Sequence, residues 1–320
     1  LVGSEMCIRD RYGLSKEKVN LLNKVETIVI DEISMVRADL MDVMNEILQQ
    51  FFLTDEPFGG KQLIMVWDMF QLPPVVRGTE REYFQDVYGS PYFFAPSWYE
   101  DLDAKTIELQ HIYRQEDVAF KSVLNKIRLW IQTEDDLKIL NACVWKKLPS
   151  QTHPITLVTT NSDAEKINFE QLELLDEEVE TARAVVTWNV PKNMYMNDLL
   201  VTFKAWSQVM MLVNGDQYSN GSLGVIISYS SEEKKAVIDI DGRQVKVWYH
   251  TREIRQPVYN KEQKKIINEP VGAFAQLPFK LAWAITIHKS QGVTFDHVIV
   301  DLWRYVFAKG QAYVALSRVT

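Results

Sequence analysis

Two carboxylates directly follow a short apolar, β-branched run near the start of the chain. Residues 25–30 read VETIVI, which predicts a buried strand of a parallel sheet, and Asp31 and Glu32 come next. Ligands of open α/β sheets bind at the carboxyl ends of the strands. Phosphoryl transfer needs one acidic group to hold Mg²⁺ and a second to orient or deprotonate the attacking water. Asp31 suits the metal role and Glu32 the water role, and the alternative is a solvated strand end.

A helix is expected immediately after this acidic pair. Ser34 is a suitable N-cap for a helix over residues 35–52. The apolar residues of that stretch recur with helical spacing and predict one buried face, made of Val36, Leu40, Val43, Met44, Ile47, Leu48 and Phe51.

A second apolar run, LIMV at 63–66, leads into a loop that contains two consecutive prolines. The loop reads QLPPV from Gln71 to Val75, and its prolines end the strand and stiffen the chain. The side chain of Gln71 can donate to and accept from an assembly of phosphate and water. It therefore suits a sensor of the terminal phosphate, although a stiff turn with a solvated glutamine is the simpler alternative.

Five ordered segments of the chain carry a family resemblance. They read VIDEISM, FGGKQLIMVWDMFQLPPVV, LQHIYRQED, LAWAITIHKSQGVTFDHVIVDL and QAYVALSRVT, and they resemble motifs II to VI of superfamily-one helicases. The most similar branch contains the RecD, Dda and petite-integration-frequency (Pif) helicases, which move 5′ to 3′ on single-stranded DNA. The resemblance covers residues 25–320. It implies an ATP-dependent DNA helicase that uses ATP and Mg²⁺ and acts in DNA repair, recombination or telomere maintenance.

This resemblance also implies a role for individual residues. Asp31 corresponds to the Mg²⁺ ligand, Glu32 to the catalytic carboxylate and Gln71 to the sensor of the γ-phosphate. Arg114 and Arg318 resemble two arginine fingers, whose planar guanidinium groups suit the spreading charge of phosphoryl oxygens. On the DNA side the resemblance implies contacts from Thr159, Asn161, His288, Lys289 and Ser290, with Gln291 and Gly292 on the nucleotide side.

The sequence departs from the family pattern at two places. A phosphate-binding loop reads G-x-x-x-x-G-K-[ST], and the Gly-Gly-Lys at 59–61 fails this pattern because Asp55 and Gln62 occupy its outer positions. We expect the phosphate loop upstream of residue 1, so the chain alone is expected to be inactive. Trp67 stands where the family has glycine. Its ring either narrows the approach to the nucleotide or reflects an error in the sequence.

Composition indicates an intracellular protein, and the overall acidity argues only weakly against binding to nucleic acid. No apolar run is long enough for a membrane span and no signal-peptide core is present, so we expect a cytoplasmic location, or the nucleus or mitochondrion in a eukaryote. Two cysteines exclude a disulfide framework and a zinc site. The net charge is −8, but residues 276–320 carry five basic and two acidic side chains. The segment with the expected DNA loop is thus locally basic.

The expected fold class is α/β, with a partial first RecA-like lobe and a second RecA-like lobe that carries an inserted small β-barrel. Residues 1–11 fit no pattern and are interpreted as a non-native leader. We assign 12–106 to the first lobe, 107–214 with 276–320 to the second, and 215–275 to the barrel, because the apolar period changes to two there. Within the barrel, Asp241 and Gly242 predict a hairpin turn.

Two other functions are consistent with the same residues. Because the phosphate loop is missing, the chain can be a module that binds single-stranded DNA without hydrolysing ATP. It can also resemble the RecD subunit of a helicase-nuclease complex, which works with partner subunits. The expected partners are single-stranded DNA and duplex junctions in each case, and membranes are not expected.

Overall fold

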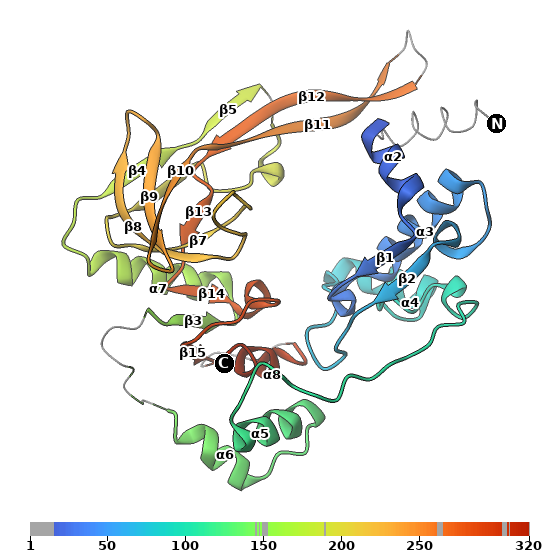
Figure 1. Cartoon of the computed structure of the whole chain (residues 1–320), viewed down its shortest axis with the longest axis horizontal. Coiled ribbons are helices and arrows are strands. Elements are labelled where there is room, and N and C mark those ends of the chain that lie inside the picture. Colours follow the sequence, from blue (N-terminus) through green and yellow to red (C-terminus); the bar gives the residue numbers. More distant parts are fainter. Residues whose placement is uncertain are drawn as a thin grey trace. The chain divides into compact units, whose positions relative to one another are not determined.

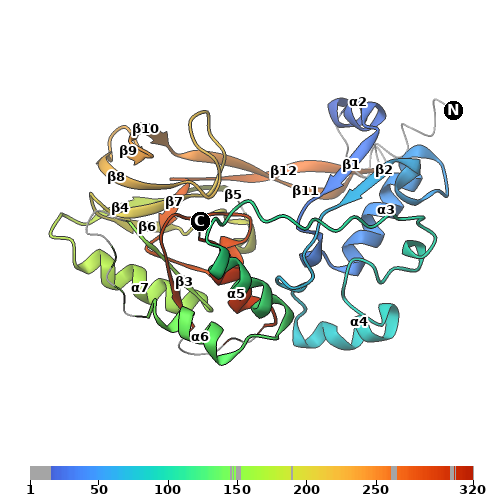
Figure 2. The same cartoon turned by 60° about the horizontal axis from the view of Figure 1, so that its bottom comes forward.

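The computed structural model of this chain describes residues 16–144, 146, 148, 153–188, 190–260, 265–302, 306 and 308–319. The chain divides into two compact units (Figures 1 and 2). Unit 1 consists of Leu1–Asn141, Tyr259–Ile267 and Val306–Val314, and unit 2 of Ala142–Val258, Asn268–Tyr305 and Ala315–Thr320. The expected leader, residues 1–11, lies outside the described residues, and the domain boundaries given above remain predictions. No helix in the described part of the chain is long and apolar enough to cross a membrane.

Unit 1 is mostly helical. Its α-helices and strands are α2 (Lys16–Lys24), β1 (Thr27–Ile30), α3 (Ala38–Phe52), β2 (Gln62–Met65), α4 (Arg81–Tyr88), α5 (Val118–Leu129) and α6 (Glu134–Asn141). Short 3₁₀ helices lie between them at Ile33–Met35, Pro57–Gly60, Gly78–Glu80 and Ser97–Tyr99.

The strands β1 and β2 pair in parallel, with Thr27 opposite Gln62 and Ile30 opposite Met65. Their alternate side chains face opposite sides of the sheet. Ile28, Ile30, Leu63 and Met65 pack on a core with Met41 and Leu48 of α3 and with Ile33, Phe58 and Phe93. The two predicted apolar runs therefore form strands, and the acidic pair that follows β1 lies at the carboxyl end of this sheet.

The predicted start and buried face of the first long helix were partly wrong. Ser34 lies inside the 3₁₀ helix Ile33–Met35, and the residue that caps α3 is Arg37, with no side-chain capping bond. Leu40 and Val43 are about half exposed, whereas Asn45 is buried. Asn45 is buried because its Oδ1 accepts the backbone N–H of Phe58 at 2.7 Å, so a polar side chain ties α3 to the loop before β2.

Unit 2 contains the remaining strands. They are β3 (Ile155–Val158), β4 (Glu180–Arg183), β5 (Val185–Trp188), β6 (Leu200–Phe203), β7 (Gln208–Met211), β8 (Leu223–Ser230), β9 (Lys235–Ile240), β10 (Arg243–Trp248), β13 (Phe279–Leu281), β14 (Ala284–Thr286) and β15 (Val298–Asp301). Its helix α7 spans Asn161–Glu173, and α8 spans Gln311–Leu316 across the division between the units. The long strands β11 (His250–Asn260) and β12 (Lys265–Gln276) form a sheet with β5.

The central strand of one sheet of unit 2 is β3, which is paired in parallel with β14 on one side and β15 on the other. The helix α7 packs against it, and the Asn168 amide fixes this packing because it donates to the carbonyl of Ala284 at 2.9 Å and accepts from its N–H at 2.8 Å. Figure 1 shows these three strands beside α7. The carboxyl ends of β3 and β14 therefore lie at the same edge of the sheet.

A closed β-barrel is not found among the described residues. The region instead forms an open antiparallel sheet of five strands in the order β10-β9-β8-β7-β13. Two of its strands, β7 and β13, lie outside the predicted segment 215–275. Closure fails because β10 and β13 are edge strands that do not pair, while β11 and β12 join β5. The predicted turn is confirmed, since Asp241 and Gly242 both have positive φ between β9 and β10, as a type I′ turn requires.

Candidate nucleotide and DNA sites

The acidic pair lies in a tight turn at the end of β1. The N–H of Glu32 donates to Oδ1 of Asp31 at 2.9 Å, and Glu32 itself has left-handed backbone angles, φ 51° and ψ 37°. The next residue, Ile33, is buried and donates its N–H to the carbonyl of Val66 at 3.0 Å. Because both sides of the turn are anchored, the direction in which Glu32 leaves the sheet is fixed by the backbone.

The loop after β2 holds Gln71 through Asp68. The carboxylate of Asp68 accepts the N–H of Phe70 at 3.0 Å and the side-chain amide of Gln71 at 3.3 Å, and its carbonyl accepts the N–H of Gln71. Since β1 and β2 are parallel neighbours, Asp68 and Gln71 emerge at the same edge as Asp31 and Glu32. Asp68 is a positioning residue that the sequence argument missed, although its place three residues before Gln71 was a usable signal.

Residues far along the chain also surround this loop within unit 1. A Cβ on Gly310, which has φ 80°, would lie 2.4 Å from the carbonyl oxygen of Gln71, so only glycine fits there. The guanidinium of Arg128 lies 5.0 Å from the ring centroid of Phe70. Burial raises the pKa of Tyr313, and its hydroxyl bonds to Asp68 and Arg128. No local pattern marks these three residues, because their partners are distant in sequence.

The Gly-Gly-Lys segment does not form a phosphate cradle. Gly59 and Gly60 belong to a 3₁₀ turn that leads into β2, whereas a phosphate loop runs from a strand into a helix. The ammonium of Lys61 lies over the ring of Phe52, 4.3 Å from its centroid. The other departure from the family pattern, Trp67, packs against Phe93 in the core of unit 1, with ring centroids 5.5 Å apart.

The arginine that precedes α5, Arg114, lies at a bend outside the helices and strands, and its side chain is exposed. The segment after it is well anchored. Gln115 is buried and accepts the N–H of Asp117 at 2.9 Å, and Asp117 caps α5 by accepting the N–H of Phe120 at 2.9 Å. The cap at Asp117 thus fixes the backbone that follows Arg114.

The second loop of interest follows β14 in unit 2 and forms a 3₁₀ helix over Ile287–Ser290. Burial lowers the pKa of His288, which favours its neutral form, and Lys289 is exposed. Ser290 is buried, and its hydroxyl donates to the carbonyl of Ile287 at 2.8 Å. Of the residues expected to contact DNA here, Lys289 is thus the most accessible, while Ser290 shapes the loop.

Three more of the expected residues follow the ends of these strands. Thr159 is buried directly after β3, Asn161 is exposed as the first residue of α7, and Gly292 is exposed with φ 76°. Thr160 follows Thr159 and caps α7, because its hydroxyl oxygen accepts the N–H of Asp163 at 3.2 Å. The structure therefore gathers Thr159, Asn161, His288 and Lys289 at one edge of the β3 sheet. The nucleotide-side role of Gln291 and Gly292 stays a prediction.

The last expected residue, Arg318, is only 2% exposed. Its guanidinium donates to the hydroxyl of Ser317 at 3.0 Å, and its carbonyl accepts the N–H of Phe295 at 2.9 Å. A bridge between Phe295 and Val319 continues this pairing. The approach of Arg318 to the acidic pair of unit 1 stays a prediction.

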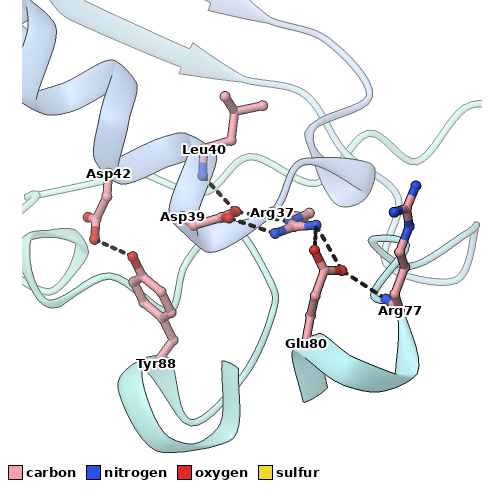
Figure 3. A network of polar contacts seen from close by, with 7 residues as sticks. All are labelled: Arg37, Asp39, Leu40, Asp42, Arg77, Glu80 and Tyr88. Atoms are coloured by element: carbon pink, nitrogen blue, oxygen red, sulfur yellow. Dashed lines mark hydrogen bonds and ion pairs between the residues drawn. The ribbon is translucent and has the colours of Figure 1, made fainter. Parts of the chain in front are cut away.

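A polar network in unit 1 fixes the start of α3 against α4 (Figure 3). Arg37 donates to Asp39 at 2.7 Å and to Glu80 at 3.1 Å, and its pKa is raised chiefly by the bond to Asp39. The backbone N–H of Arg77 and then Arg37 lower the pKa of Glu80. At the other end of α4, the hydroxyl of Tyr88 donates to Asp42 at 2.8 Å. The network supports the helix that covers β1 and β2 and contributes none of the expected site residues.

Comparisons with known proteins agree with this geometry. A family model described as PIF1-like helicase matches residues 6–136. The chain is 30% identical to ATP-dependent DNA helicase Pif1 of Campylobacter jejuni over 99% of the chain and 73% of that protein. It is 32% identical to human ATP-dependent DNA helicase PIF1 over 92% of the chain, which spans 44% of the human protein.

Solved structures show the same fold. Bacteroides Pif1 bound to single-stranded DNA has a TM-score of 0.81 and 37% identity, covering 96% of this chain and 71% of that one. The same values hold for Bacteroides Pif1 in complex with ADP-AlF3 and single-stranded DNA. The mixed α/β fold is therefore that of the RecA-like helicases. Within this class, the chain belongs to the Pif1 helicase family.

Proposed function

We propose that the complete gene product is an ATP-dependent helicase that moves 5′ to 3′ along single-stranded DNA and opens duplex junctions. Membership of the Pif1 family supports this activity, because its relatives are named as ATP-dependent DNA helicases. The observation that carries it is the pair of anchored loops at one edge of the β1–β2 sheet. One presents Asp31 and Glu32, and the other presents Gln71 on the carboxylate of Asp68.

The donor set fits Mg²⁺ supplied together with a nucleotide. Such sites use one or two carboxylates and complete the shell with phosphate oxygens and water. Asp31 accepts one N–H, and a carboxylate has room for about four such bonds, so it retains capacity for the ion. Bound there, Mg²⁺ would neutralise phosphate charge.

Each protein side chain has a distinct part in hydrolysis. Glu32 orients the attacking water and accepts its proton, and its fixed left-handed backbone limits the positions its carboxylate can reach. Gln71 bonds both the water and the γ-phosphate and thereby reports whether the phosphate is present. Arg114 and Arg318 stabilise the charge that builds up in the transition state.

The DNA strand lies on the edge of the β3 sheet in this proposal. Lys289 neutralises a backbone phosphate, and His288, Thr159 and Asn161 contribute neutral hydrogen bonds. Ser290 acts through the shape of the loop, since its hydroxyl bonds to the carbonyl of Ile287. Contacts of this kind grip the phosphate backbone without reading bases, as a motor that slides along DNA needs.

Hydrolysis stimulated by single-stranded DNA tests the proposal. We expect Glu32→Gln in the complete gene product to reduce the ATP turnover number by about 10²–10⁴-fold while nucleotide affinity changes little. The matched control is Glu46→Gln, an exposed carboxylate on α3, which should hydrolyse ATP at the wild-type rate. Equal turnover in the two variants would end the assignment of Glu32.

A second candidate function concerns the 320-residue chain by itself. Its sequence has no phosphate loop, whereas the candidate DNA edge of unit 2 is formed within it. We expect this polypeptide to bind a labelled single-stranded oligonucleotide without hydrolysing ATP, with an affinity that falls as salt rises. Lys289→Ala should weaken binding and flatten the salt dependence. Lys138→Ala, an exposed lysine paired with Asp135 on α6, should change neither.

A further inference from the structure

Three tryptophans of this chain occupy backbone conformations that favour glycine. Trp130 and Trp188 have φ 61° and Trp206 has φ 67°, in the left-handed region. Bulky side chains are rare there, because Cβ crowds the following carbonyl oxygen. Among the described residues, three of the eight non-glycine residues with positive φ are tryptophan, although the chain has nine tryptophans in 320 residues. This concentration calls for an explanation specific to tryptophan.

The first of them, Trp130, ends helix α5 in a Schellman motif. Its N–H donates to the carbonyl of Ile127 at 3.2 Å, and the N–H of Ile131 donates to that of Lys126 at 3.0 Å. This bond pattern places Trp130 at the left-handed position that glycine usually fills. Its side chain is 69% exposed, so the indole gains little from burial in return for the unfavourable backbone.

The turn between β6 and β7 gives the second case. The N–H of Ser207 donates to the carbonyl of Lys204 at 3.2 Å, which makes Trp206 the third residue of a four-residue turn. Positive φ at that place is what a type II turn requires, and glycine supplies it without crowding. The N–H of Trp206 also donates to the carbonyl of Ile226 at 2.7 Å, so the backbone of the turn is locked while the ring is 54% exposed.

At the end of β5, Trp188 pairs with Gly272 of β12. The two backbones approach closely here, since a Cβ on Gly272 would lie 2.2 Å from the carbonyl oxygen of Thr187. Left-handed residues at such sites in sheets are usually glycine. The ring of Trp188 is 74% exposed.

Other tryptophans of the chain behave as tryptophans normally do. Trp98 packs edge-on against Phe58 with centroids 5.2 Å apart, and its Nε1 donates to Asp42 at 2.6 Å. Trp248 is 54% exposed, like Trp206, but it lies in the strand β10 and its φ is not positive. Exposure alone therefore does not define the group; the left-handed backbone does.

We propose that the natural protein carries glycine at positions 130, 188 and 206, and that the codons read there as tryptophan are decoded as glycine in its source. A single codon, UGA, can account for this difference between tryptophan and glycine. UGA is a stop codon in the standard genetic code, and it is read as tryptophan in some reassigned codes and as glycine in others. Tryptophans that pack normally, such as Trp98, come from UGG in this account. The proposal rests on backbone geometry and does not depend on the helicase assignment.

Two measurements on the gene and its product test this directly. The coding sequence should read UGA at codons 130, 188 and 206 and UGG at codon 98. Mass spectrometry of peptides from the source cells should show the residue mass of glycine, in place of that of tryptophan, at each of the three positions. UGG at these three codons, or tryptophan in the native peptides, would overturn the proposal.

Thermal unfolding gives an independent physical test. In the chain as given, Trp130→Gly, Trp188→Gly and Trp206→Gly should each raise Tm by roughly 2–4 °C, because each relieves a left-handed conformation that costs tryptophan more than glycine. Trp248→Gly is the matched control for Trp206→Gly, with the same exposure but extended backbone, and should lower Tm or leave it unchanged. Equal responses at Trp206 and Trp248 would contradict the account.

Discussion

The parallel sheets of the two units differ in how far their strands are buried. In unit 2, β3 has parallel neighbours on both edges, and Ile155, Leu157 and Val158 are at most 1% exposed. In unit 1, β1 pairs with β2 alone, and Val29 and Ile64 are 60% and 43% exposed. Parallel strands are normally covered on both faces. The central strand β3 meets this rule within the described chain, and the β1–β2 sheet meets it on one face only.

This difference distinguishes the two faces of the β1–β2 sheet. One face of the β1–β2 sheet is complete, since Ile28, Ile30, Leu63 and Met65 pack against the core with α3. The opposite face presents apolar side chains to solvent. We interpret it as the surface that other parts of the first lobe cover in the complete gene product, in line with the prediction that residues 12–106 form only part of that lobe.

The largest effect is expected in the buried strand. Leu157→Ala should lower the free energy of unfolding of unit 2 by about 2–5 kcal/mol, because it leaves a cavity at the centre of the β3 sheet. Ile299→Ala, on the 42% exposed position of the neighbouring strand β15, should cost about 0.5 kcal/mol or less. Urea denaturation followed by circular dichroism measures both, and similar losses would remove the contrast between buried and exposed positions.

A smaller effect on stability is expected in the β1–β2 sheet, and its size should differ between this chain and the complete gene product. Val29→Ala should change the stability of the 320-residue chain by about 0.5 kcal/mol or less, since the side chain is exposed. In the complete gene product the same change should cost about 1–2 kcal/mol, because a covered valine loses buried apolar area. If urea titrations give the same small value in both proteins, nothing covers this face.

The smallest effect is local to the helices of unit 1 and depends on pH. The ion pair with Lys126, at 2.7 Å, and the bonds from Thr133 lower the pKa of Asp136 from 3.8 to about 2. A depressed pKa stabilises the fold above pH 4, and this contribution is lost as pH falls toward 2. The protection of the α6 amides against hydrogen exchange, corrected for the intrinsic pH dependence of exchange, should therefore fall on acidification more in the wild type than in Asp136→Asn. Asp135→Asn, an exposed neighbour, should behave like the wild type.

Local patterns were sufficient to predict the elements that carry the chemistry. The β-branched run before Asp31 forms β1, and the run before Gln71 forms β2. The buried face of α3 was mispredicted at Leu40 and Val43, because burial depends on which neighbours cover the helix and not on spacing alone. The expected barrel is not confirmed, because the edge strands β10 and β13 of the five-stranded sheet do not pair with each other.

The candidate site was predictable where its residues follow a strand and was missed where they come from elsewhere. Asp31, Glu32 and Gln71 are marked by their position after apolar runs. Gly310 and Tyr313 reach the Gln71 loop from more than two hundred residues away, so no motif identifies them. The positive φ of Trp206 likewise became apparent only from the backbone, since the sequence around it has no turn signal.

The central proposal is that Asp31, Glu32 and Arg318 all act in the hydrolysis of ATP. Single-turnover ATP hydrolysis by the complete gene product with Arg318→Lys tests it most directly, with nucleotide affinity and the melting of unit 2 measured alongside. The account predicts that hydrolysis falls by about 10³-fold or more, while affinity stays within a few-fold and unit 2 remains folded. Wild-type hydrolysis by this variant would contradict the claim.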